Sequence, residues 1–231
     1  MILCMIPCRL ESKRVYCKNI RYLGDKPLVE HIIATAKTVF APRNIVLNAA
    51  EPIFQHIAVR NGIEYYKRPA ELSEDHVTND LFMYDFLKRH ECEWVLQAHT
   101  TSPFLTSSDF VYFLHLITHE SADVDCMFAV EEHQIGAVFR GRAVNFDSGS
   151  RILPSQELEP VQVFCNGLMA FRRDAFIKNY EEKGYALFAG RPLYVPLSGY
   201  STLDIDTEDD FRLAEGIYAA LQHDSEPRYF E

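Results

Sequence analysis

The fold is decided in residues 2–21, which read ILCMIPCRLESKRVYCKNIR. Residues 2–6 form a continuous apolar run, which is typical of a strand buried on both faces. Between Arg9 and Arg21 there are five basic residues and one acid, although the whole protein has a formal net charge of −10. In α/β folds the loop after the first strand lies at the carboxyl edge of the sheet, where ligands bind. The segment therefore predicts a polyanion site, with a nucleotide's phosphates as the best candidate, against the alternative of a solvated basic loop.

The residues after this segment alternate between short strands and helices. From Pro27 apolar residues repeat at helical spacing, and proline suits the first turn of a helix. We expect further strands at residues 44–47, 63–67 and 94–98, and helices at 51–60, from Thr78 to about 89, and at 110–118 with Ser107 or Ser108 as cap. This βαβα order predicts an α/β fold: a Rossmann-like, mostly parallel sheet with helices on both faces.

The second half of the chain has more strand character. Residues 137–146 predict a hairpin that turns at Gly141-Arg142, and residues 161–171 predict a further strand. We expect a small β-rich insertion at about 133–165, within a single domain of residues 1–231.

Composition excludes several classes of protein. The chain is 48% hydrophobic and 24% charged, as in ordinary globular proteins. Its acidic balance argues against a nucleic-acid partner, because phosphate-backbone binding needs an extended basic surface. No apolar run approaches the roughly 20 residues of a membrane span, and residues 1–7 are too short for a secretory signal. We expect a cytoplasmic protein with no membrane partner, in which the six cysteines, none in a C-x-x-C pair, are structural thiols.

An acidic run near the carboxyl end divides into two parts. Asp204 and Asp206 are two residues apart, so on an extended segment they project to the same side. Paired carboxylates suit a hard divalent cation such as Mg²⁺. Thr207 is a candidate helix cap, and the acids at 208–210 would then occupy the first turn, where negative charge is favourable.

Several motifs together resemble one known family. Residues 6–20 read IPCRLESKRVYCKNI and residues 24–28 read GDKPL. Further motifs follow in the same order: RPAEL at 68–72, LQ at 96–97, TSP at 101–103, NG at 166–167 and FRR at 171–173. The chain resembles the CMP-sialic acid synthetase family, the acylneuraminate cytidylyltransferases, which activate eight- and nine-carbon sugar acids. The resemblance implies a fold of the nucleotide-diphospho-sugar transferase type.

The resemblance also implies an activity and a set of site residues. The activity is transfer of CMP from CTP to a sialic-acid-like keto sugar acid, with release of pyrophosphate, in a homodimer whose dimerisation segment is the insertion. The implied nucleotide-binding residues are Arg9, Ser12, Lys13, Arg14, Lys18, Asn19 and Arg68. The implied catalytic residues are Arg9, Lys18 and Asp206; those that contact the acceptor are Gln97, Thr101, Ser102 and Asn166; and Asp204 and Asp206 would bind Mg²⁺ or Mn²⁺.

Departures from the family pattern leave the acceptor open. Glu11 stands where the family usually has glycine, and Leu105 stands where it commonly has arginine. The alternatives are the same chemistry on a non-sugar anion such as a phosphonate, or a non-catalytic nucleotide-binding homologue. We expect one cation among Arg140, Arg142, Arg151, Arg172 and Arg173 to replace the lost arginine. His99 is either a structural hydrogen-bonding residue or a base.

Overall fold

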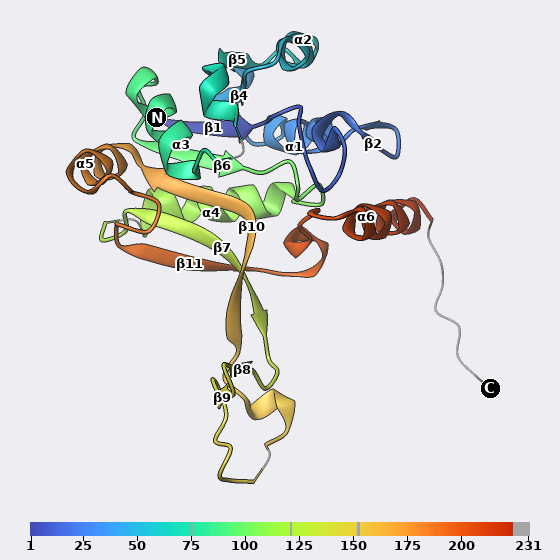
Figure 1. Ribbon diagram of the computed structural model, residues 1–231, viewed down its shortest axis with the longest axis vertical. Helices are drawn as coiled ribbons and strands as arrows, with labels where there is room; N and C mark the ends of the chain where they lie inside the picture. Colours follow the sequence, from blue (N-terminus) through green and yellow to red (C-terminus); the bar gives the residue numbers. More distant parts are fainter. Residues whose placement is uncertain (75, 121, 152, 224–231) are drawn as a thin grey trace.

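A computed structural model gives the fold and describes residues 1–74, 76–120, 122–151 and 153–223. Its centre is a seven-stranded sheet in the order β11-β7-β10-β6-β1-β4-β5 (Figure 1). The strands are β1 (Ile2–Pro7), β4 (Ile45–Ala49), β5 (Glu64–Lys67), β6 (Trp94–Ala98), β7 (Cys126–His133), β10 (Val161–Arg172) and β11 (Pro192–Leu197). Only β10 runs antiparallel to its neighbours in this sheet. The predicted mostly parallel α/β sheet is confirmed.

Helices cover both faces of the sheet. They are α1 (Leu28–Lys37), α2 (Pro52–Asn61), α3 (Asn79–Arg89), α4 (Ser107–His119), α5 (Arg173–Lys183) and α6 (Glu208–Leu221). Side chains of α1, α2 and α4 form one buried cluster with one face of the sheet, and side chains of α3 and α5 form another with the opposite face. Helix α6 packs on a third, smaller cluster, beside the short strands β2 (Tyr22–Leu23) and β3 (Lys26–Pro27).

Strand β1 is buried on both sides, as its apolar run predicts. Cys4 and Ile6 belong to the cluster on the α1 face, whereas Leu3 and Met5 belong to the cluster on the α3 face. This alternation follows from the two-residue repeat of side chains along a strand. Burial on both faces agrees with the place of β1 inside the sheet, between β6 and β4. The basic loop follows the carboxyl end of β1 and therefore lies at that edge of the sheet.

Two helix caps and one turn refine the sequence predictions. Thr106, rather than Ser107 or Ser108, caps α4, because its hydroxyl accepts from Asp109 N while the Asp109 carboxylate accepts from Thr106 N. Thr207 caps α6 in the same way with Asp210, as expected. The hairpin of β8 (Val138–Phe139) and β9 (Arg142–Ala143) turns one residue earlier than predicted, at 140–141, where both φ values are positive.

Strands β7 and β10 continue beyond the sheet as a two-stranded arm (Figure 1). The arm pairs Val161 with His133 and carries the β8–β9 hairpin at its far part, so the predicted insertion at about 133–165 lies on it. Asn145 organises the arm, because its side chain receives a hydrogen bond from Ala137 N at 2.9 Å and donates to Ile135 O at 2.7 Å. Within the described residues, every helix is too short or too polar to cross a membrane.

Candidate functional site

A cleft of about 500 Å³ lies at the carboxyl ends of the central strands. The segments that follow β1, β5 and β6 supply most of its walls. All seven residues predicted to bind the nucleotide line it: Arg9, Ser12, Lys13, Arg14, Lys18, Asn19 and Arg68. Five cations therefore share one cavity in an acidic protein, and this arrangement favours a polyanionic ligand.

The basic loop after β1 is tied to its neighbours by side chains. Asn19 Nδ2 donates to Arg9 O at 2.8 Å, and Asn19 Oδ1 accepts from the Thr100 hydroxyl. Glu51 Oε1 accepts from Leu10 N at 3.0 Å. Both polar atoms of the Asn19 amide are thus engaged with protein, so Asn19 holds the loop against the segment after β6. These bonds give the loop its shape before any ligand binds.

Arg68 is a buried cation at the base of the cleft, with 4% of its surface exposed. Its guanidinium donates to Cys8 O and, at 3.1 Å, to Ser73 Oγ, and it lies over the ring of Phe82 with 5.1 Å to the centroid. Burial is the main effect that lowers the pKa of Arg68; an arginine nevertheless stays charged at any working pH. These partners hold the guanidinium in one orientation at the cleft wall.

Lys18 and Arg14 meet Asp206 on the opposite wall. Arg14 donates to Asp206 Oδ1 at 2.7 Å, and Lys18 Nζ lies 3.7 Å from the same oxygen. Lys18 also donates to Ile205 O and is itself buried. Burial lowers the pKa of Lys18, while the carboxylates of Asp206 and Asp204 offset part of this effect. Residues nearly two hundred positions apart thus form one charged cluster.

Asp204 lies behind Asp206, and its carboxylate is largely engaged within the protein interior. Its Oδ1 is buried and has no hydrogen-bond partner among the described residues. Thr101 hydrogen-bonds to this carboxylate, and Asn166 Nδ2 lies 3.5 Å from Oδ2. Burial, with repulsion from Asp206, raises the pKa of Asp204 above its usual value. An unpaired buried carboxylate oxygen is costly, and a divalent cation is the partner that would satisfy it.

The candidate metal site would consist of two carboxylates, those of Asp204 and Asp206. Across the described ranges, no cluster of three or more His, Cys, Asp or Glu side chains could hold a metal ion. Mg²⁺ is commonly held by one or two carboxylates together with substrate phosphates and water. Asp204 and Asp206 beside a polyanion cleft therefore fit Mg²⁺ better than a metal that requires a complete protein cage.

Of the residues predicted to contact the acceptor, some line the cleft and others are buried beneath it. Thr101 lines the cleft, whereas Gln97 and Ser102 are fully buried and do not. Asn166 has a left-handed backbone, with φ of 54°, at the irregularity in β10, and its side chain is directed to Asp204. His99 takes the place in the cleft wall that was expected of Gln97.

Five residues of the cleft wall were not predicted as site residues: Pro7, Cys8, Phe82, His99 and Thr100. Phe82 reaches the cleft from α3, and nothing in the local sequence distinguishes it from the other apolar residues of that helix. His99 and Thr100 could have been found from their position directly after β6, because loops at the carboxyl edge of parallel strands form ligand sites.

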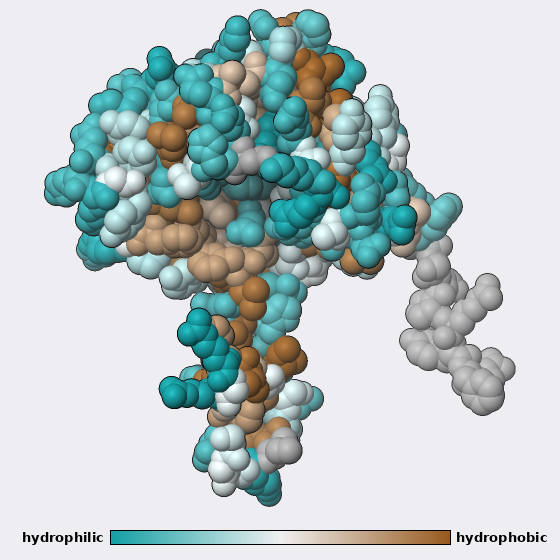
Figure 2. Space-filling model, viewed as in Figure 1, coloured by the Kyte–Doolittle hydropathy of each residue, from teal (hydrophilic) through white to brown (hydrophobic). Residues whose placement is uncertain are grey.

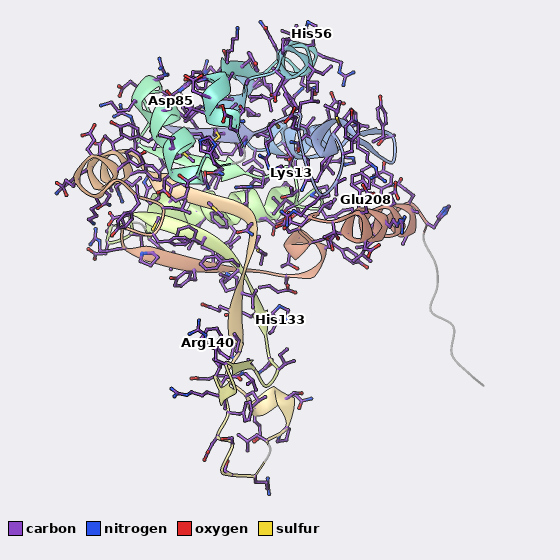
Figure 3. All side chains as sticks on the ribbon, in the orientation of Figure 1. Lys13, His56, Asp85, His133, Arg140 and Glu208 are labelled. Carbon is purple, nitrogen blue, oxygen red and sulfur yellow. The ribbon has the colours of Figure 1, made fainter. Side chains whose placement is uncertain are left out.

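None of the five arginines expected to replace the missing one, Arg140, Arg142, Arg151, Arg172 and Arg173, lines this cleft. Arg172 lies over the Trp94 ring, 4.7 Å from its centroid, at the end of β6 opposite the cleft. Arg173 donates to Leu87 O and His90 O at the same end. Arg140 lies on the arm, far from Lys13 in the cleft (Figure 3). Leu105 itself is in the core and 2% exposed.

The fold and the cleft define a nucleotidyltransferase-type protein, and comparison with known proteins identifies its family. Residues 3–159 match the family model described as Cytidylyltransferase, which is more than half of the chain. The chain belongs to the cytidylyltransferase family, and the resemblance inferred from its motifs is confirmed.

Individual relatives are distant. The N-acylneuraminate cytidylyltransferase of Streptococcus agalactiae serotype III is 26% identical over 217 residues, covering 90% of this chain and 51% of the relative. The chain thus spans about half the length of that protein. The CMP-N,N'-diacetyllegionaminic acid synthase of Legionella pneumophila is 24% identical over 232 residues, covering 94% of this chain and 95% of the relative.

Solved structures share the fold. A CMP:2-keto-3-deoxy-manno-octonic acid synthetase complexed with CTP has a TM-score of 0.70 at 15% identity, covering 95% of this chain and 99% of that chain. A 4-diphosphocytidyl-2C-methyl-D-erythritol synthase from Anaerococcus prevotii has a TM-score of 0.64 at 16% identity, covering 96% and 98%. At these identities the likeness is one of fold.

Proposed function

We propose that the protein transfers CMP from CTP to an acidic sugar of the sialic acid type and releases pyrophosphate. One observation carries the proposal: five cations and Asp206 meet in one cleft of a cytidylyltransferase-family chain, with the carboxylate of Asp204 behind that of Asp206. The N-acylneuraminate and N,N'-diacetyllegionaminate relatives support an acidic sugar as the acceptor.

The reaction needs alignment and charge neutralisation rather than a covalent intermediate. The acceptor's hydroxyl oxygen forms a bond to the α-phosphorus and loses its proton to solvent, the bond from that phosphorus to the bridging oxygen breaks, and pyrophosphate leaves with the electron pair. Arg9, Lys13 and Lys18 would bind the triphosphate and stabilise the charge that grows on the leaving group. The bonds that Asn19 makes to Arg9 O and to the Thr100 hydroxyl fix the backbone at Arg9 against the segment after β6.

Asp204 and Asp206 would hold Mg²⁺, or Mn²⁺ in its place. The unpaired Oδ1 of Asp204 supports this role. A bound divalent cation would supply charge neutralisation at the phosphates and would favour ionisation of the acceptor's hydroxyl. Arg14 donates to Asp206 Oδ1 and Lys18 Nζ lies 3.7 Å from the same oxygen, so both cations would compete with a metal ion for this carboxylate.

We also propose that the protein works as a homodimer through the arm. The arm exposes several large apolar side chains; Val138, Phe139, Val163 and Phe164 are between 43% and 65% exposed. Hydrophobic residues occur along the arm and at its junction with the body (Figure 2). Val163 and Phe164, which could have been core residues, are thus on the surface. A monomeric mass in solution at micromolar concentration, with full activity, would contradict this proposal.

The activity can be tested by pyrophosphate release. We would incubate the protein and Mg²⁺ with CTP, UTP, GTP or ATP and with one of three acids: N-acetylneuraminic acid, N,N'-diacetyllegionaminic acid or 2-keto-3-deoxy-manno-octonic acid. We expect release with CTP and at least one acid, and none without the acid. Equal release with ATP or GTP would contradict the assignment of cytosine as the base. Turnover of a phosphonate in place of all three acids would contradict the assignment of an acidic sugar as the acceptor.

A further inference from the structure

One part of the cleft wall has polar side chains that the proposed chemistry has not used. Gln97 in β6 and His99 directly after it project to the same side of the sheet, the side covered by α3 and α5, because they are two residues apart. Gln97 is fully buried, and its register partners on the two neighbouring strands are Met5 and Met169. His99 lines the cleft.

The contact between these two residues determines where the imidazole carries its proton. Gln97 Nε2 lies 2.7 Å from His99 Nε2. With the Gln97 amide in this orientation its nitrogen can only donate, so the ring nitrogen accepts, and a neutral imidazole that accepts at Nε2 has its proton on Nδ1. Burial, and next the charge of Lys18, lower the pKa of His99 to about 4, which keeps the ring neutral.

The second ring nitrogen is left for a ligand. In the part of the chain that the structure describes, the one side-chain hydrogen bond of His99 is the bond to Gln97. Nδ1–H is therefore an unused donor on a residue of the cleft wall. His99 N donates to Gly167 O at 3.0 Å, which ties this wall to β10.

Gln97 has no other evident purpose at its position. Its Oε1 is buried and unpaired within the described residues, and such an acceptor lowers stability. A methionine or leucine would fill the space between Met5 and Met169 without that cost. The amide contributes one interaction to the fold, and that interaction orients His99.

We propose that His99 is the positioning residue for the acceptor, its Nδ1–H donating a hydrogen bond to the carboxylate of the acidic sugar, with Gln97 holding the ring in the tautomer that donates. The inference rests on the proposed function and deepens it. The place of His99 favours the acceptor over the nucleotide: β6 lies between β1, which leads to the basic loop, and β10, which leads to the arm.

Three variants separate positioning from a structural role. His99→Leu removes the donor, His99→Asn keeps an N–H donor near the Nδ1 position, and Gln97→Met removes the group that orients the ring. With CTP and whichever of the three sugar acids the native protein uses best, we expect His99→Leu to raise the KM of the acid at least tenfold and to leave the KM of CTP within twofold. His99→Asn should recover most of the loss.

Gln97→Met gives a result that a purely structural role would not produce. We expect it to raise the melting temperature or leave it unchanged, while the KM of the acid rises three- to tenfold. If His99→Leu does not fold, His99→Asn and Gln97→Met still test whether His99 binds the acceptor. An unchanged KM of the acid in Gln97→Met, or equal changes in the KM of CTP and of the acid, would overturn the assignment.

A spectroscopic measurement distinguishes failure of this inference from failure of the proposed function. ¹⁵N NMR of the imidazole should report the proton on Nδ1 in the native protein and a mixture of tautomers in Gln97→Met. A proton on Nε2 overturns the inference, whatever the activity. The Nδ1–H tautomer in a protein that turns over none of the three acids overturns the proposed function and, with it, the carboxylate as the bound group.

Discussion

The two sides of the cleft differ in how their side chains are assembled. Six of the seven predicted nucleotide residues come from one stretch, residues 9–19, and Arg68 completes the set. The acceptor side is assembled from the segment after β6, the irregular part of β10 and residue 204 before α6. A site built from one continuous loop is visible in the sequence, whereas a site built from three separate segments depends on how those segments pack.

Asp206→Ala is expected to have the largest effect, because it removes a carboxylate that both sides of the cleft share. We expect kcat to fall at least about 10³-fold, which corresponds to about 4 kcal/mol. The free energy of unfolding should change far less than the activation free energy, because the ion pair with Arg14 is largely exposed and buried Lys18 keeps its hydrogen bond to Ile205 O. Steady-state kinetics and thermal melts measure the two quantities.

Asp209→Ala is the matched control for that change. Asp209 lies in the same acidic run, but its side chain is exposed and pairs only loosely with Arg212, at 3.6 Å. It is expected to lose about 0.3–1 kcal/mol of favourable interaction with the helix dipole and to keep its activity. Equal loss of activity in both variants would contradict the division of this acidic segment into a functional pair, Asp204 and Asp206, and the acids at 208–210 in the first turn of α6.

Arg68→Met tests the nucleotide side alone. It removes a charged donor from Cys8 O and Ser73 Oγ, and hydrogen bonds to charged groups contribute about 1.5–3 kcal/mol. We expect the KM of CTP to rise about 10- to 100-fold and the KM of the acid to change little. Arg60→Met, which removes a surface arginine paired with Glu30, is the control and should leave both constants unchanged.

The acceptor side should make stability depend on pH. The folded state holds the pKa of His99 at about 4, below its ordinary value near 6.5, so the unfolded state binds the proton first as pH falls. The stability due to His99 is present above pH 6.5 and decreases as pH falls toward 4. Denaturant unfolding should show that the native protein loses roughly 1–2 kcal/mol more than His99→Asn between pH 6.5 and 5. Parallel curves for the two proteins would show that the ring is not held neutral.

Arg14→Gln should have the smallest effect. Arg14 is exposed and pairs with Asp206 across the cleft, and such pairs contribute about 0–1 kcal/mol to stability. The KM of CTP is expected to rise less than tenfold, because other cations of the cleft remain. Isothermal titration with Mn²⁺ alone should show tighter metal binding, since Asp206 is then released from one competing cation. Weaker Mn²⁺ binding would contradict the competition between Arg14 and the metal.

Much of the fold could be predicted because its signals are local. The apolar run of β1, the helical spacing after Pro27 and the strand at Trp94–Ala98 each depend on a few consecutive residues. The cap of α4 was misassigned among adjacent hydroxyl residues, because the choice depends on which one faces Asp109. The roles of Arg172 and Arg173 could not be predicted, because their partners, Trp94 and the end of α3, are distant in sequence.

The sequence by itself determined that a buried first strand leads into a basic loop, that an Asp-x-Asp pair precedes a capped helix, and that the chain belongs with cytidylyltransferases. Only the tertiary structure decided that Asp206 meets Arg14 and Lys18, that Gln97 is buried, and that His99 lies in the cleft wall. The physical reason is that the two sets of features depend on contacts between residues at different separations along the chain. Strand and helix periodicity depend on neighbouring residues, whereas the register of β6 between β1 and β10 determines which of two polar side chains at its end lines the cleft.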